Sequence, residues 1–415
     1  MKDLSSKNII MGLQHTFVMF GATVLVPLIT GLDVGVTLFA AGIGTLLFHF
    51  LTKFQVPVFL GSSFAFIPGI IAVSTAEGGS LPEALGGIVI AGLLYIVVAF
   101  IFKFVNAEVL HKILPPFVTG PIIVLIGLIL APVAIKNANG TFAPDIVEKI
   151  GINGCWGIAL FTFTVAVFVK IYFLKKGLKF LSMLPVLISL ISGYMLAIIV
   201  GIVDFTSITE ANWFGIPNFS LPVFTTRSIS IIVPIAVVTI VEHFGDILAI
   251  GNVVGKDFIE KPGIHRTLLG DGIATSLSAL IGGPANTTYS ENTGAVALTG
   301  VYNPLIMRIA AVFAIVLSVV PKFTSIISTI PGPVIGGISI LLFGMISSIG
   351  IKNMVDHKVD FTNPKILMIS AAMLVLGLGG AQFNFGKIEL SGLGLSAIVG
   401  ILMNLILNFN EIKKK

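Results

Sequence analysis

Residues 286–294 read NTTYSENTG, a polar string with one carboxylate that stands between two apolar stretches. A charged side chain at membrane depth costs about 2.5–3.5 kcal/mol on insertion scales, so such a string needs a reason to be there. Its Thr and Tyr residues also favour an extended segment before the chain becomes helical. The string therefore predicts a ligand site inside a membrane-embedded fold.

The composition supports a membrane protein. Hydrophobic residues make up 56% of the 415 residues and charged residues 10%, and the mean hydropathy is +1.07, whereas soluble domains are about 25% charged. At about 20 residues per span, the length allows roughly fourteen helices and no folded soluble domain. The single cysteine, Cys155, excludes an intrachain disulfide and a cysteine-based metal cluster. The first apolar stretch lacks a signal-peptide cleavage site, so we expect a retained span.

Apolar stretches predict the positions of these spans and the orientation of the chain. The spans are expected near residues 8–30, 34–52, 57–74, 84–104, 113–134, 152–173, 181–203, 228–250, 266–282, 286–300, 304–326, 331–350, 364–381 and 391–409. With a cytoplasmic amino terminus, 19 of the 24 Lys and Arg residues fall on the cytoplasmic side, which agrees with the positive-inside rule. We expect a multi-pass protein of the cell inner (plasma) membrane with both termini cytoplasmic. The net charge of +5 needs no nucleic-acid partner.

The chain also contains a weak internal repeat. Three matches recur in the same order, residues 14–15 with 242–243, 62–64 with 287–289, and 116–127 with 333–344. We therefore divide the single membrane domain, 1–415, into repeats 1–205 and 225–415. Seven spans in each repeat force opposite orientations in the bilayer. This inverted-repeat plan is typical of secondary transporters, in which solute and coupling ion bind near the midplane where helices are interrupted.

The third and tenth spans are the expected interruptions. Both are short, begin near Pro or Gly, and carry β-favouring residues before turning helical. Lipid forbids the unpaired backbone groups of such a half-extended segment, but a buried solute site can use them. Helix starts after Phe64 and Tyr289 would direct N–H groups at carbonyl oxygens of a ligand. Alternatively, Ser62 and Ser63 serve only helix packing.

Four acidic residues lie within predicted spans: Glu242, Asp246, Asp271 and Glu291. Glu242 and Asp246 are four residues apart and share one helical face. Burial and a neighbouring carboxylate both favour the protonated form of a carboxyl group, so one of these groups could carry a proton. The alternative for each is a buried acid that is satisfied by hydroxyl or backbone N–H donors. No grouping has the spacing of a metal site, and His243 is expected to be a packing residue.

Several motifs in order resemble the nucleobase-ascorbate transporters, also called the nucleobase-cation symporter-2 family. The resemblance runs along essentially the whole chain and rests on Gln14-His15, MFGATVLVP (19–27), GSSFAF (61–66), Glu242-His243 with Gly245, NTTYSENTG (286–294) with Thr299, and PVIGGIS (333–339). Glu291 is similar to the uracil-transporting branch, whereas purine branches usually carry Gln at this position. The family implies transport, not catalysis, and no cofactor.

The resemblance further implies a fold of fourteen transmembrane helices in two inverted repeats, with spans 3 and 10 partly extended. It divides them into a core domain, from about 8–104 and 228–326, and a gate domain, from about 113–203 and 331–409, and implies a homodimer. It places the base at six residues: Phe64, Glu242, Tyr289, Ser290, Glu291 and Ser339. Glu242, Asp246 and Asp271 are then the candidates for coupling to H⁺, with Na⁺ as the other possible ion.

Four positions depart from the uracil branch: Asp246, Asp271, Ser290 and Phe343. The two aspartates are more similar to the purine branch, so a purine permease (xanthine, hypoxanthine or uric acid type) is the alternative to a uracil permease. A passive channel and an intramembrane enzyme are more distant alternatives. Residues 61–64 faintly resemble a serine-hydrolase turn, but no His and Asp partners follow in a recognisable order.

Overall fold

The computed structural model describes residues 5–105, 107–385 and 388–408. The first half contains α1 (Ser6–Thr30), α2 (Val34–Leu51), β1 (Leu60–Ser62), η1 (Phe64–Phe66), α3 (Ile67–Ser74), α4 (Leu81–Phe102), α5 (Ala107–Ile113), α6 (Pro116–Ala138), α7 (Pro144–Lys175), α8 (Lys179–Ser182), α9 (Pro185–Val200) and α10 (Thr206–Glu210). The second half contains α11 (Thr226–Val254), η2 (Ile259–Gly263), α12 (Ile264–Leu280), β2 (Asn286–Thr288), α13 (Ser290–Thr299), α14 (Leu305–Ser318), α15 (Pro321–Ser328), α16 (Gly332–Asp356), α17 (Pro364–Leu378), β3 (Gln382–Phe385), β4 (Ile388–Ser391) and α18 (Gly392–Leu407).

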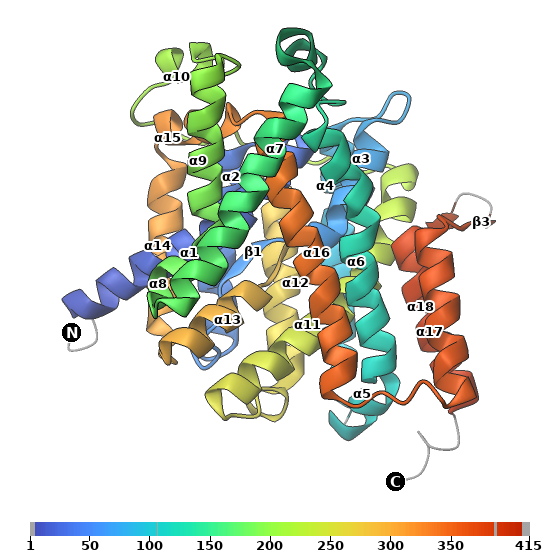
Figure 1. Ribbon diagram of the computed structural model, residues 1–415. Helices are drawn as coiled ribbons and strands as arrows, with labels where there is room; N and C mark the ends of the chain where they lie inside the picture. The colour runs from blue at the N-terminus through green and yellow to red at the C-terminus, as the bar shows by residue number, and fades with distance from the viewer. Residues whose placement is uncertain (1–4, 106, 386–387, 409–415) are drawn as a thin grey trace.

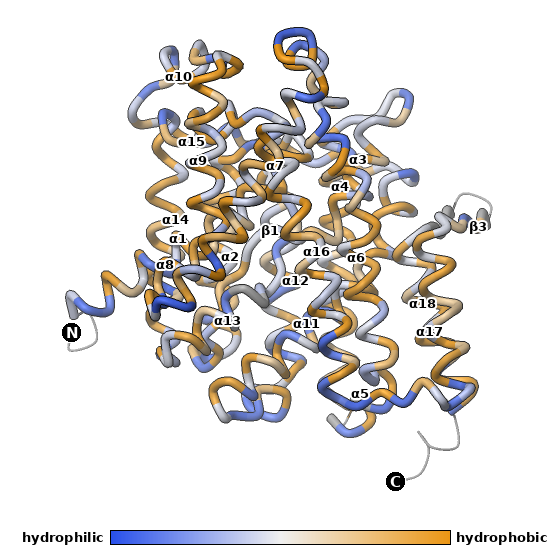
Figure 2. The backbone as a smooth tube through the Cα atoms, in the orientation of Figure 1, coloured by the Kyte–Doolittle hydropathy of each residue, from blue (hydrophilic) through white to orange (hydrophobic). Residues whose placement is uncertain are grey.

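Every predicted span contains a helix, and half of these spans contain a long apolar helix. Seven helices of the described chain are at least 18 residues long and apolar enough to cross a membrane: α1, α2, α4, α6, α7, α11 and α16. The pair α14 and α15 passes the same test but bends by 87° at its break. In Figure 2 apolar backbone covers the middle of the molecule, and hydrophilic backbone gathers in its upper and lower loops. This banding is that of a multi-pass membrane protein.

Local sequence signals explain where the first helices begin and end. The Ser5 hydroxyl accepts a hydrogen bond from the Asn8 amide at the start of α1, and the Asp33 carboxylate caps α2 in the same way. Helix α1 ends at Gly31, whose φ of 80° is in the left-handed region that glycine adopts at no steric cost. Because only Gly31 and Leu32 separate the last residue of α1 from the cap of α2, a tight turn joins the two helices.

The helices pack in pairs that recur between the two halves of the chain. Helix α4 packs on α11 and α12, and α14 packs on α1 and α2. In the same way α7 packs on α9 and α16, and α17 packs on α18 and α6. The pairs α2 with α12 and α6 with α16 join the two halves. Each packing pair thus has a counterpart when the first span is matched to the eighth, the second to the ninth, and so on.

The predicted extended segments of spans 3 and 10 are confirmed as β1 and β2. They pair antiparallel, with Leu60 opposite Thr288 and Ser62 opposite Asn286. The pair lies at about mid-height of the molecule, surrounded by helices (Figure 1). Because each strand is followed by a helix and the strands run in opposite directions, α3 and α13 leave the pair in opposite directions.

The predicted spans did not account for several short elements: α10, η2 and the strands β3 and β4. Strands β3 and β4 pair antiparallel between α17 and α18, and α7 begins eight residues before its predicted start. At Gly151 (φ 70°) the backbone of α7 is not helical, so its first two turns form a separate piece. Helix α10 and the bend between α14 and α15 lie at the top of Figure 1, and α5, α8 and α13 lie in its lower half.

Candidate functional site

The strand pair brings two helix starts together without side-chain caps. Ser63 precedes η1 and Tyr289 precedes α13, and neither side chain makes a capping hydrogen bond among the described residues. Backbone N–H groups in the first turn of a helix have no partner within that helix, and they favour a carbonyl or an anion. The predicted arrangement of two donor-bearing helix starts is therefore present on either side of the β1–β2 pair.

Hydroxyl groups from neighbouring helices hold the strand pair in place. Thr45 of α2 accepts a hydrogen bond of 2.9 Å from the Leu60 amide, and Thr275 of α12 donates one of 2.8 Å to the Asn286 carbonyl. The Ser62 hydroxyl donates to the carbonyl of Thr23 in α1. These hydrogen bonds satisfy backbone groups that have no partner within the two-stranded sheet, so the extended segments can persist inside the bilayer.

Tyr289 is held by the first strand. Its hydroxyl donates a hydrogen bond of 2.9 Å to the carbonyl oxygen of Ser62, and its ring lies directly over Gly61. A Cβ atom at Gly61 would stand 2.5 Å from two ring carbons of Tyr289, closer than real Cβ contacts allow. Glycine is therefore required here by close approach of the ring.

Three aromatic rings meet beside the strand pair. The rings of Phe64 and Tyr289 are nearly parallel, at 6° and with centroids 6.4 Å apart. Phe343 of α16 meets Phe64 edge to face with centroids 6.0 Å apart. All three rings are buried. Ser339 lies one turn before Phe343 on α16, is also buried, and donates its hydroxyl to the Ile335 carbonyl.

The carboxylates of α11 and α12 approach the same region. Glu242 is half-buried on α11. One turn further on, Asp246 accepts a hydrogen bond of 2.9 Å from Thr288 of β2. Asp271 is fully buried on α12, with an oxygen 3.3 Å from Nδ1 of His243. The sequence singled out these acids and also Thr288, in the polar string, and His243, beside Glu242, but it did not show that Thr288 pairs with Asp246 or His243 with Asp271.

Two predicted site side chains, those of Ser290 and Glu291, lie outside the described residues, although their backbone begins α13. The following residue, Asn292, was not among the predicted site residues. It is buried and donates a hydrogen bond of 3.0 Å to the Pro57 carbonyl just before β1. Asn292 therefore ties α13 to the approach of β1, a role whose signal was its place in the polar string.

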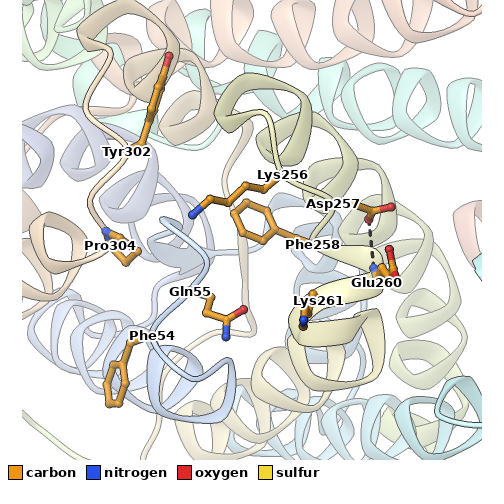
Figure 3. A pocket seen from close by; sticks show the side chains of 9 residues that line it. All are labelled: Phe54, Gln55, Lys256, Asp257, Phe258, Glu260, Lys261, Tyr302 and Pro304. Atoms are coloured by element: carbon orange, nitrogen blue, oxygen red, sulfur yellow. Dashed lines mark hydrogen bonds between the residues drawn. The ribbon is translucent and has the colours of Figure 1, made fainter.

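Two cavities of the described chain are lined by residues other than Phe64, Tyr289 and Phe343. One of about 490 Å³ lies among loops, and Figure 3 shows its charged side chains. Two lysines, Lys256 and Lys261, and two acids, Asp257 and Glu260, give its lining no net charge, and Asp257 accepts the Glu260 amide at 3.1 Å. The other, of about 190 Å³, is a crevice between α1 and α13 on one side and α7, α9 and α16 on the other. Its lining includes Leu342, the neighbour of Phe343.

A family model for a permease family matches residues 6–385 of the chain. The chain belongs to this permease family. The permease is therefore a membrane transporter, not an enzyme. It is 46% identical over 407 residues to the uracil permease of Bacillus caldolyticus, an alignment that covers 96% of this chain and 91% of that protein. It is 40% identical over 404 residues to the uracil permease of Escherichia coli strain K12, covering 96% and 91%.

Solved structures of other transporters share the fold of the permease. The transmembrane domain of the cyanobacterial bicarbonate transporter BicA superposes with a TM-score of 0.64 at 15% identity, covering 96% of this chain and 97% of that one. The murine anion transporter Slc26a9 superposes with a TM-score of 0.69 at 12% identity, covering 99% and 69%. These structures confirm the helical transporter fold. Within the described part of the permease, His, Cys, Asp and Glu form no group of three suited to a metal ion.

Proposed function

We propose that this permease carries uracil into the cell together with a proton, by alternating access. The main support for this proposal is the β1–β2 pair, around which uncapped helix starts, aromatic rings and acidic side chains lie. Uracil carries N–H donors beside carbonyl oxygens, so carboxylates can accept its N–H groups while backbone N–H groups donate to its oxygens. The ring faces pack on aromatic side chains. The curated relatives named as uracil permeases support the same substrate.

The proposed binding residues are those expected from the sequence. Phe64 and Tyr289 supply the aromatic wall, Glu242 and Glu291 accept base N–H groups, and Ser290 lies at the start of α13. Ser339 approaches from α16. Phe64 and Phe343 are in contact across the boundary between the proposed core and gate domains, so the site would open and close as these two groups of helices move against each other.

The proposed domains follow the packing of the helices. The core domain comprises spans within 8–104 and 228–326, and the gate domain spans within 113–203 and 331–409. The recurring packing pairs support two inverted repeats, 1–205 and 225–415. We further propose that the protein lies in the cell inner membrane as a homodimer. Both of its termini are then in the cytoplasm. The lysines of α5 and α8 support a cytoplasmic location for the side of the membrane on which these two helices lie.

The proton is proposed to travel on Glu242, with Asp271 and then Asp246 as the next candidates. Asp246 accepts a hydrogen bond from Thr288, and Asp271 lies beside His243. Glu242 is less enclosed, at the position that the repeat matches to Gln14. Coupling to Na⁺ instead of H⁺ would appear as uptake that follows a sodium gradient at constant pH.

Purified permease in proteoliposomes tests the function. Labelled uracil should enter against its gradient when the lumen is alkaline and the outside acidic, and excess unlabelled uracil inside should drive counterflow of unchanged label. Competition by thymine, xanthine and hypoxanthine then tests the base. A purine that outcompetes uracil would favour the purine alternative, which the two aspartates Asp246 and Asp271 suggest.

Glu291→Gln provides the sharpest test of the site. The substitution turns one acceptor oxygen into an amide donor that faces a base N–H, so a buried donor is left unpaired at about 1–3 kcal/mol. Uracil binding should fall about tenfold or more, while the protein still folds and inserts. Wild-type affinity in this variant would show that Glu291 does not hold the base.

A further inference from the structure

The crevice of about 190 Å³ has apolar walls with one exception. Phe17 of α1, Leu298 of α13, Leu187 of α9 and Met345 of α16 are typical of its lining. Lys170 of α7 is the one ionisable residue of that lining. The crevice lies between residues of the proposed core (α1 and α13) and of the proposed gate (α7, α9 and α16). Its lining includes Met183, next to α8, and residues of α13, and α8 and α13 lie in the lower half of Figure 1. This is the side to which the lysine distribution assigns the cytoplasm.

Lys170 differs from the lysines that end the same helix. Lys175 and Lys176 are exposed, and the Lys176 amine lies over the Tyr172 ring at 5.8 Å. Lys170 stands five residues earlier, about 7.5 Å deeper along the helix, and is half-buried. Among the described residues no carboxylate lies within ion-pair distance of its amine.

A lysine can extend its amine along an apolar surface to reach water, which is the ordinary explanation for such a residue. That explanation accounts for Lys175 and Lys176 at the helix end. Lys170 instead lines a crevice that it shares with Gly294 of α13, and Gly294 is about one helical turn after Ser290, where α13 begins. Ionisable residues inside membrane helices generally face solute pathways.

Resting on the proposed function, we propose that Lys170 binds the carbonyl oxygens of the base as it leaves the site toward the cytoplasm. An ammonium group offers three hydrogen-bond donors and no acceptor, which fits a small ring that carries carbonyl oxygens. The apolar walls contact the faces of the ring. Lys170 therefore sets the affinity of the cytoplasmic side of the transport cycle and leaves that of the external side unchanged.

The sidedness of the effect makes the inference testable. Right-side-out and inside-out membrane vesicles report the half-saturating uracil concentration at the external and cytoplasmic faces. In Lys170→Met the cytoplasmic value should rise about fivefold or more, because a charged donor is lost, while the external value stays the same. Lys170→Arg should restore most of the affinity, and Lys175→Met, the matched control at the end of α7, should behave as wild type at both faces.

The single cysteine of the chain allows a chemical rescue. Cys155 is buried and lies outside the crevice lining, so Cys155→Ala provides a background for Lys170→Cys. An aminoethyl thiosulfonate reagent then rebuilds an ammonium at this position, and an ethyl reagent rebuilds only its bulk. Recovery of the cytoplasmic affinity with the amine alone supports the inference.

Other outcomes separate the two proposals. Equal effects of Lys170→Met at both faces, or equal recovery with both reagents, would overturn the role of Lys170 while uracil transport itself stands. Wild-type vesicles that carry no uracil would instead overturn the proposed function.

Discussion

The hydroxyl of Tyr289 donates a hydrogen bond of 2.9 Å to the carbonyl oxygen of Ser62, and so joins the second half of the chain to the first. The ring that carries this hydroxyl covers Gly61, where a Cβ atom has no room. Gly61 and Tyr289 therefore pack as one unit, because the missing side chain of the first makes room for the ring of the second. Since Tyr289 also precedes α13, this unit fixes where the α13 amide groups point.

Gly61→Ala should therefore impair binding. The added methyl would stand 2.5 Å from ring carbons of Tyr289, so the ring must move and its bond to Ser62 must stretch or break. We expect uracil affinity to fall about tenfold, measured by scintillation proximity or calorimetry on purified protein. Gly157→Ala is the matched control, because a Cβ there meets nothing within 4 Å. Unchanged affinity in Gly61→Ala would contradict the role of Tyr289.

Phe64→Ala should reduce uracil binding more than tenfold, because it removes the ring that contacts both Tyr289 and Phe343. Phe66 is an unsuitable control although it lies two residues away, since it is fully buried and its truncation would cost about 3–5 kcal/mol of folding free energy. Phe100→Ala, exposed on α4, is the better comparison. Phe64→Leu retains bulk without the flat ring, and wild-type binding in that variant would show that no aromatic wall is needed.

His243→Leu should strongly destabilise the permease. It would leave the carboxyl group of Asp271 fully buried without its partner, which typically costs about 3–5 kcal/mol. The double variant His243→Leu with Asp271→Leu should recover much of that loss, because it removes both polar groups. Thermal unfolding in detergent, followed through the reactivity of the buried Cys155, measures both effects. A double variant less stable than His243→Leu would mean that the pair does not act as a unit.

Glu242→Gln should separate exchange from accumulation. The amide resembles a permanently protonated carboxyl group, so uracil can still bind and exchange across the membrane, but no proton accompanies it. Uptake by the wild type should fall as external pH rises, because the protonated form is then less populated, and uptake by the variant should lose this dependence. Accumulation of uracil by Glu242→Gln under an imposed pH gradient would assign the proton to Asp271 or Asp246 instead.

Much of the fold could be predicted because the apolar stretches are long and their interruptions are polar. All fourteen predicted segments contain helices, and the Ser, Thr and Tyr residues around positions 62 and 288 marked the two strands. The β3–β4 hairpin was missed, although Phe383 and Phe385 alternate with polar residues as in a strand. Such a short alternation between two apolar stretches has little weight against the helical pattern on either side.

The candidate site was only partly predictable from the sequence, because a sequence identifies polar groups and not their partners. Asp246 and Asp271 were both candidates for carrying a proton, yet one accepts a bond from Thr288 and the other lies beside His243. In the sequence Lys170 counted only as one of the 19 basic residues on the cytoplasmic side, because a sequence does not show which neighbours a side chain of α7 meets. Only the packing of α7 against the crevice distinguishes it from Lys175.

The pairing of β1 with β2 also constrains how the protein is made. At about 5–20 residues per second, the ribosome completes Thr288 roughly 10–50 s after Leu60. Throughout that interval the first strand has no partner strand, and unpaired backbone groups are costly in lipid. The hydroxyl of Thr45, which is synthesised earlier and bonds to Leu60, can hold one of these groups in the meantime. The centre of the molecule therefore assembles only after about two thirds of the 415 residues have been translated, so a truncated first half would reach the membrane without the partner of its first strand.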